Sequence, residues 1–388
     1  MYYPPFCPNP NCTNHHEVPR KNKYSWFAKD GFYSSCLLGK TQRYKCKQCK
    51  IRFSKQTFSL DYYAKKKIRY QNLLKELVST SNLSDMSRRF GVSHNTISNK
   101  IRRLSRQALG VNSHLRQHIS LHEPFVADGF EGVAVNFYYP NNVNIMMGKN
   151  SLFFYVFNYT TIKRTGKLTE KQRADRDYYE SIWKADTKGV KHSFNRLVED
   201  LAQLDFIDHD IFPMVLFTDK KLEYKRALRG NRFFRTLSEG ELFYHFTISS
   251  KEPRTLENPL FPVNYMDRQF RKDIAEHVTK SICFAKNVNN QMERMHIYQF
   301  YHNYIKKNRV REKRYLTHST LAGIPNSLRK SYLNLFFTER VFVSHLNLDR
   351  AEVACWNRGY VTPLRLQEEH LPAYLSPLPA LLYEDWCA

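Results

Sequence analysis

Residues 125–130, FVADGF, and residues 212–219, FPMVLFTD, decide the fold of the largest part of this chain. Each is a short apolar run, which is typical of a buried strand, and each delivers an aspartate, Asp128 or Asp219. Further strands are predicted at residues 151–162 and 241–249, and helices at residues 169–204, 222–228 and 272–308. This order predicts an α/β domain, in which sites commonly lie at the carboxyl ends of the strands.

Upstream of this domain, residues 67–104 have the pattern of a helix-turn-helix. An amphipathic helix is predicted at residues 67–78, and a short one, capped by Ser84, ends at Phe90. Gly91 supplies a left-handed turn residue, and Ser93 caps a second helix over residues 94–104. An ordinary helical hairpin is the alternative. The residues expected to face outward and contact DNA are Asn95, Thr96, Ser98, Asn99, Lys100, Arg102 and Arg103.

Five of the eight cysteines fall within the first 49 residues. Cys7 and Cys12 form one closely spaced pair, and Cys46 and Cys49 form a second. Zinc takes four soft ligands at tetrahedral corners, and two such pairs on facing turns supply them. The sequence therefore predicts one structural zinc ion in a small ribbon. The alternatives for the ligand set are His15, His16 and Cys36.

The composition points to a polyanionic partner. Among 388 residues, 61 are Lys or Arg and 36 are Asp or Glu, so the net charge is +25. Residues 1–120 carry +18 of this charge, which places most of the positive field on the ribbon and the helix-turn-helix. With 42% hydrophobic residues, the chain is not a disordered polycation. No apolar run approaches the roughly 18 residues of a membrane span, and the N-terminus does not resemble a signal peptide.

A third carboxylate completes a possible metal site. Residues 272–308 contain Glu293, and a helix there could bring this side chain to the two aspartates. Converging carboxylates repel one another unless cations lie between them, and oxygen ligands favour Mg²⁺ or Mn²⁺. Two such ions can activate a water or a 3′-hydroxyl and stabilise the leaving oxygen of a phosphodiester. Taken singly, each of these acids could instead be a cap or a surface ion-pair residue.

Together these motifs resemble the bacterial insertion-sequence transposases of the DDE class. The resemblance covers roughly residues 7–324. It rests on the two cysteine pairs and on six stretches: YKCKQCKIRFS (44–54), FGVSHNTISNKI (90–101), VADGFE (126–131), VLFTDKK (215–221), NVNNQMER (287–294) and THSTLAGI (317–324). It implies an RNase H-like catalytic domain with a mixed sheet, and the catalytic, magnesium-binding triad Asp128, Asp219 and Glu293.

The resemblance also implies the reaction, in which a strand is hydrolysed at a transposon end and the freed 3′-hydroxyl is joined to target DNA. Asp267 is the alternative third carboxylate, and Glu131 is a possible auxiliary. Some members carry a basic residue shortly after the glutamate, but position 300 here is Phe. Arg294, His296 and Lys306 are substitutes, and the basic run at residues 306–314 is a further candidate for contact with the DNA backbone.

The expected organisation is multidomain: a zinc ribbon (1–60), an all-α helix-turn-helix (61–118), an RNase H-like α/β domain (119–325) and a C-terminal extension (326–388). The expected partners are the two transposon ends and target double-stranded DNA, with the protein a homo-oligomer on DNA and no membrane contact. The expected location is the bacterial cytoplasm, on the nucleoid. Two other functions stay open: a catalytically inactive, transposase-derived DNA-binding regulator, and a metal-dependent nuclease that does not join strands.

Overall fold

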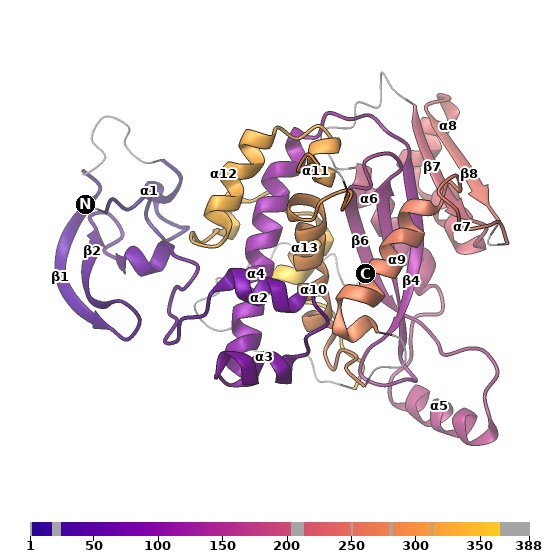
Figure 1. Ribbon diagram of the computed structural model, residues 1–388, viewed down its shortest axis with the longest axis horizontal. Coiled ribbons are helices and arrows are strands. Elements are labelled where there is room, and N and C mark those ends of the chain that lie inside the picture. The colour runs from indigo at the N-terminus through magenta and orange to yellow at the C-terminus, as the bar shows by residue number, and fades with distance from the viewer. Residues whose placement is uncertain are drawn as a thin grey trace.

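The computed structural model describes residues 2–17, 25–202, 213–249, 251–278, 282–311 and 313–364. At the N-terminus, a small three-stranded antiparallel sheet lies to one side of the molecule (Figure 1). Its elements are α1 (Thr13–His16), β1 (Phe27–Ser35), β2 (Gly39–Cys46) and β3 (Arg52–Ser54). Trp26 stacks on Phe53 at a centroid distance of 5.6 Å and closes a small aromatic core. The short strands predicted around the second cysteine pair are confirmed.

The helix-turn-helix follows, with α2 (Tyr70–Leu77), α3 (Leu83–Phe90) and α4 (His94–Leu115). Gly91 ends α3 with a φ of +62°, and the Ser93 side chain accepts a hydrogen bond from the backbone N–H of Thr96, as predicted. The predicted cap at Ser84 is wrong. Asn82 caps α3 instead, because its side chain accepts a hydrogen bond from the N–H of Asp85 at 2.9 Å. Helix α4 continues far beyond residue 104 because its second half is buried.

The main domain is built on a five-stranded mixed sheet in the order β6-β5-β4-β7-β8. Strands β4, β5 and β6 are antiparallel neighbours, whereas β7 and β8 run parallel to β4. The bounds are β4 (Phe125–Val133), β5 (Pro140–Gly148), β6 (Phe154–Thr161), β7 (Met214–Asp219) and β8 (Phe243–Ile248). Four of these strands match the sequence prediction.

Strand β5 was not predicted, because its sequence, PNNVNIMMG, contains three asparagines. All three are buried in the structure. Asn144, for example, donates to Ser193 and accepts from the Tyr224 hydroxyl at 3.1 Å each. A strand that buries polar side chains such as Asn144 does not show the apolar run that marks a buried strand.

Helices cover this sheet (Figure 1). The single helix predicted at residues 169–204 is wrong: Trp183 takes an extended conformation after α5, and α6 starts again at Gly189. Helix α5 buries none of its residues, whereas α6 packs against β5 and β6. The helices are α5 (Glu170–Ile182), α6 (Gly189–Ala202), α7 (Leu222–Gly230), α8 (Arg232–Glu239), α9 (Phe261–Asp273) and α10 (Val288–Phe300).

The C-terminal part packs back onto α4. Its helices are α11 (His318–Leu321), α12 (Asn326–Phe336) and α13 (Arg350–Asn357). Phe336 stacks on Phe300 at 3.8 Å, and one apolar core joins residues of the helix-turn-helix, the sheet and α12. Residues 365–388 of the predicted C-terminal extension lie outside the described residues. No described helix combines the length and the apolar character needed to cross a membrane.

A buried ion-pair network fastens α13 to the end of α4. The guanidinium of Arg116 lies 2.9 Å from Glu352 and 3.2 Å from Asp349. Burial raises the pKa of Glu352 to about 7 even though Arg116 opposes this shift. The network therefore keeps two buried acids compensated by one cation.

Arg116→Met is expected to lower the free energy of unfolding by about 3–5 kcal/mol, because it leaves two buried carboxyls without their cation. Urea denaturation at neutral pH measures the change. Arg350→Met is the matched control, since Arg350 is exposed and lies 3.9 Å from Glu199. It should cost no more than about 1 kcal/mol. Equal losses in the two variants would contradict the role given to this network.

Candidate functional site

The pairing of β4 with β7 brings the two predicted aspartates to neighbouring positions. Phe125, Val126 and Ala127 pair in parallel with Leu216, Phe217 and Thr218, so Asp128 and Asp219 are the next residues on adjacent strands. Neighbouring strands lie about 5 Å apart, and paired positions point to the same face. Both side chains are half-buried. The convergence of these two carboxylates was predicted from their place at the ends of apolar runs.

Electrostatics show that the two acids affect one another. Burial raises the pKa of Asp128 to about 6, and the negative charge of Asp219 adds to the rise. The backbone N–H of Gly129, which donates to Asp128 at 2.7 Å, and the cations Lys221 and Arg254 oppose it. A carboxyl in this position is stabilised in its ionised form when a cation comes close.

A third carboxylate, whose pKa responds to the charge of Asp128, comes from α9. Burial raises the pKa of Asp267 to about 7, and the charge of Asp128 is the next cause. Arg271, Arg254 and Lys221 lower it. Helix α9 packs directly on β4 and β5, which explains how Asp267 reaches the strand end. Asp267 was the alternative in the sequence analysis.

Glu293, the residue predicted for this role, occupies a different environment. It lies on α10 with 3% of its surface exposed, and its carboxylate is 2.6 Å from Arg358 and 3.5 Å from Arg102. Helix α10 packs along α4 rather than on β4. The carboxylate is thus held in an ion pair with two arginines, and these contacts link α4 and the C-terminal segment to α10.

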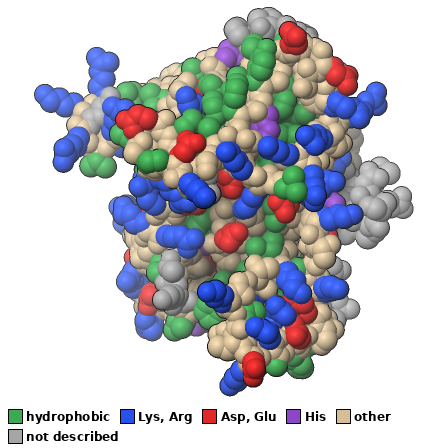
Figure 2. Space-filling view, turned by 90° about the vertical axis from the view of Figure 1, so that its right-hand side faces the viewer, with side chains coloured by type: hydrophobic (Ala, Val, Ile, Leu, Met, Phe, Trp, Pro, Cys, Tyr) green, Lys and Arg blue, Asp and Glu red, His purple; other side chains and the backbone are tan. Residues whose placement is uncertain are grey.

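Basic residues surround the three aspartates. The N–H of Lys221 donates to Asp219 at 3.0 Å, and its ammonium lies 3.9 Å from Glu131, the predicted auxiliary acid. Figure 2 shows Lys and Arg side chains spread over the side of the molecule on which β7, β8, α7 and α8 lie in Figure 1. Between β7 and α9, the exposed ones include Lys220, Lys251 and Arg254 outside the helices and Arg226 and Arg229 in α7. Lys221 and Arg254 were not predicted from the sequence, because no motif distinguishes them from other surface cations.

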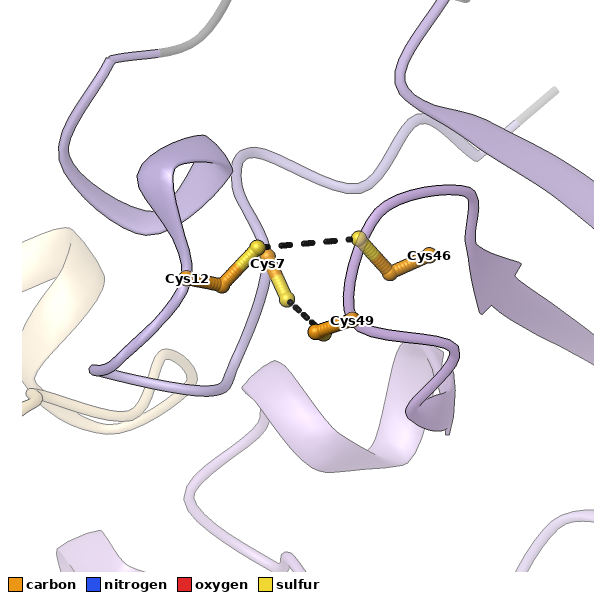
Figure 3. A group of neighbouring side chains, drawn as sticks. All are labelled: Cys7, Cys12, Cys46 and Cys49. Carbon is orange, nitrogen blue, oxygen red and sulfur yellow. Dashed lines mark hydrogen bonds between the residues drawn. The ribbon is translucent and has the colours of Figure 1, made fainter.

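The four predicted zinc ligands do come together (Figure 3). The sulfurs of Cys7 and Cys49 are 3.5 Å apart, those of Cys12 and Cys46 are 3.8 Å apart, and all four lie within 4.8 Å of one another. Four sulfurs at about 2.3 Å from a tetrahedral zinc would be about 3.8 Å apart. These cysteines could therefore hold a zinc ion.

The local backbone supports this role. Burial raises the pKa of the Cys46 thiol, but the N–H groups of Cys49 and Gln48 outweigh this effect and bring the pKa down to about 7. The alternative ligands lie elsewhere. Cys36 is exposed and belongs to no ligand cluster among the described residues, and His15 and His16 form a separate group with His345.

Only part of the predicted DNA-binding set lies at the surface. Asn95 and Asn99 are exposed, and Thr96 and Ser98 are half-buried. Lys100 is buried and pairs with Asp61, while Arg103 is buried and donates to the carbonyl oxygens of Leu60 and Tyr62. The sequence could not distinguish these cations from exposed ones, because their acceptors belong to the linker between ribbon and helices. Arg102 pairs with Glu293.

The other basic candidates for contact with DNA also differ in whether they are exposed or already paired. Lys306 is half-buried and pairs with Asp273 at 3.4 Å, whereas Arg309, Arg311, Lys313 and Arg314 are exposed. His296 is buried, and Arg294 pairs with Glu276. The exposed part of the 306–314 run is thus the part able to meet DNA phosphates.

Comparison with known proteins gives no family assignment: no protein-family model matches the chain, and no curated protein matches it. Any function proposed for this chain therefore depends on the geometry of its own sites.

In the metal-free protein, Asp128→Asn is expected to raise the free energy of unfolding at pH 7.5 by up to about 3 kcal/mol. A carboxyl whose pKa is raised by folding makes a contribution to the free energy of unfolding that is fully present below its unfolded pKa of 3.8. For Asp128 this contribution is lost as the pH rises through about 6. The wild type should therefore lose stability relative to the variant between pH 4 and pH 7.5. Urea denaturation across this range, with exposed Asp177→Asn as the control, measures it. Identical pH dependence of the wild type and Asp128→Asn would contradict the raised pKa.

Cys46→Ser is expected to remove one tightly bound zinc ion per chain and to unfold the ribbon, because structural zinc contributes about 10–16 kcal/mol to such small domains. Elemental analysis of the purified protein and limited proteolysis of the N-terminal 60 residues measure the two effects. Cys36→Ser is the matched control and should keep its zinc, since Cys36 is exposed. A full zinc content in Cys46→Ser would exclude this residue as a ligand.

Proposed function

We propose that this protein is a transposase of the DDE class, which binds transposon-end DNA and carries out metal-dependent strand cleavage and 3′-hydroxyl strand transfer. The observation that carries the proposal is the pairing of β4 with β7, which sets Asp128 and Asp219 side by side in a chain that also has a helix-turn-helix. Neither feature alone would suffice, because paired acids occur in many enzymes and helix-turn-helix units occur in many regulators.

The sheet supports the proposed RNase H-like fold. Three antiparallel strands, β6, β5 and β4, are extended by two parallel strands, β7 and β8, with helices packed against the sheet. This is a mixed sheet of the kind that the resemblance implies. The two aspartates lie on the central strand and on its parallel neighbour, at the place where open α/β sheets commonly hold their sites.

The donor set suits divalent cations. Asp128, Asp219 and Asp267 offer oxygen ligands, and the raised pKa values of Asp128 and Asp267 mean that a bound cation would relieve like-charge repulsion. Two Mg²⁺ or Mn²⁺ ions, when bound, would activate a water or a 3′-hydroxyl and stabilise the leaving oxygen. The three carboxylates are spread more widely than the cysteines, because they form no ligand group within 4.8 Å among the described residues.

The chain's own cations would position the substrate. Lys221, Arg254 and Arg271 all act electrostatically on Asp128 or Asp267, so they face the same site. A DNA phosphate next to the aspartates would meet these charges. The polar face of α4, with Asn95 and Asn99 exposed, would read base edges at a transposon end.

Joining both ends of an element to a target requires two active sites held together, so we propose that the protein acts as a homo-oligomer on DNA. We assign the third carboxylate to Asp267 rather than to Glu293. The negative charge of Asp128 contributes to the raised pKa of Asp267, so the two acids influence one another. The two arginines paired with Glu293, by contrast, would compete with any cation for its carboxylate.

The test is cleavage of DNA that carries the sequences flanking the gene, with Mg²⁺ or Mn²⁺ and purified protein. Asp219→Asn and Asp267→Asn should lower the cleavage rate by at least about 100-fold, the scale on which single catalytic groups matter. Both should bind the same DNA with unchanged affinity, measured by fluorescence anisotropy. Glu293→Gln is the matched comparison and should cleave within about tenfold of the wild type, with a lower melting temperature.

Each outcome separates the candidates. Loss of cleavage in Glu293→Gln but not in Asp267→Asn would return the third position to Glu293. Binding without cleavage by the wild type would favour the catalytically inactive regulator, and cleavage without strand joining would favour the nuclease. Equal cleavage by the wild type and Asp219→Asn would remove the aspartate pair from the mechanism.

A further inference from the structure

A second group of metal-ligating side chains lies beside the four cysteines and has no part in the proposed reaction. His15 and His16 are in α1, and His345 ends a short 3₁₀ turn (Val343–His345) more than 300 residues later. One ring nitrogen from each histidine lies within 4.8 Å of the other two. His15 is buried, while His16 and His345 are exposed, so the group, here named the histidine cluster, is open to solvent on one side.

The hydrogen bonds of the histidine cluster fix which nitrogen of each ring carries a proton. Nδ1 of His15 lies 2.6 Å from the carbonyl oxygen of Cys7, and Nε2 of His16 lies 2.9 Å from that of Pro10. Nε2 of His345 lies 3.3 Å from the carbonyl oxygen of His15. A carbonyl oxygen only accepts, so each of these nitrogens donates its N–H, and the other nitrogen of each ring keeps its lone pair.

This is the arrangement found behind metal-bound histidines. A ligating imidazole commonly donates its second N–H to a backbone carbonyl, which fixes the tautomer and the orientation of the ring. Here three imidazoles in contact share the same feature. A chance cluster would not require each ring to direct one nitrogen at a carbonyl.

The three rings lie in contact at different tilts. The centroids of His15 and His345 are 4.3 Å apart, and those of His15 and His16 are 4.8 Å apart with an interplanar angle of 77°. Nε2 of His15 accepts a hydrogen bond from the hydroxyl of Ser344 at 2.5 Å. Since Ser344 is exposed, its hydroxyl can turn away and release that lone pair.

We propose that His15, His16 and His345 bind a second zinc ion, which fastens the N-terminal ribbon to the C-terminal segment. Imidazole nitrogens suit Zn²⁺ and other borderline ions and do not suit Mg²⁺. Three histidines leave one tetrahedral position to water, and the exposed side of the cluster accommodates it. This inference does not depend on the proposed reaction.

The histidine cluster lies where the ribbon meets the C-terminal segment, so a bound ion would connect these two parts. Around it, Phe6 of the ribbon packs edge-on against Phe342 at 5.0 Å and against His345 at 4.6 Å. The two zinc sites are also connected, because His15 donates to the carbonyl oxygen of Cys7, one of the four cysteine ligands. A metal at the cluster would therefore fix the orientation of the ribbon against the body of the protein.

The test is the metal stoichiometry of the full chain. Protein stripped with a chelator under reducing conditions is titrated with Co²⁺ and, separately, with Zn²⁺. The wild type should bind two ions, one with a thiolate-to-cobalt charge-transfer band and one with weak ligand-field absorption only. His345→Ala and His16→Ala should keep the charge-transfer band and weaken the second binding event by more than about tenfold.

The controls keep the result interpretable. His118→Ala removes an exposed histidine outside the cluster and should bind two ions. The changed side chains in His16→Ala and His345→Ala are at the surface, so melting temperatures of the metal-free proteins should stay close to that of the wild type. One ion per wild-type chain, or two ions in both histidine variants, would overturn the proposal.

Discussion

The parallel pairing of β4 with β7 is the constraint on which the candidate active site depends. It fixes Asp128 and Asp219 at consecutive positions of one register, so their separation is set by the spacing of a sheet rather than by flexible side chains. The two like charges are held together in a half-buried place, and the pKa of Asp128 rises as a result. The hydrogen bonds between the strands and the burial of the apolar residues before each aspartate offset the repulsion between the two carboxylates.

Helices α9 and α10 each carry a candidate third carboxylate, but they pack in different places. Helix α9 lies on β4 and brings Asp267 to the aspartates, while α10 lies along α4 and places Glu293 between Arg102 and Arg358. Arg358 adopts a left-handed conformation with a φ of +57° at the end of α13, and its ion pair with Glu293 helps to hold it there. Glu293 thus joins α4, the main domain and the C-terminal segment.

The N-terminal ribbon is too small to be stable through an apolar core alone, and its aromatic core is correspondingly short. Two groups of side chains that could each hold a metal ion lie here: the four cysteines inside the ribbon, and the histidine cluster between the ribbon and residues 343–345. Lys100 and Arg103, which the sequence predicted as DNA contacts, instead connect α4 to residues 60–62.

The sequence by itself determined the local features. It predicted the cysteine pairs, the turn at Gly91, the cap at Ser93 and four of the five strands of the main sheet, because each depends on residues close together in the chain. It also predicted that Asp128 and Asp219 would meet, since both lie at the ends of apolar strands.

Only the tertiary structure decided the features that depend on distant partners. Strand β5 was missed because it buries three asparagines, of which Asn144 bonds to α6 and α7, a pairing that no local pattern reveals. The placement of Asp267 beside Asp128, the ion pairs of Glu293 and the meeting of His15 with His345 result from the packing of helices and loops. Packing brings together residues that are tens to hundreds of positions apart, so neither spacing nor residue type could distinguish an acid that faces another acid from one that faces an arginine.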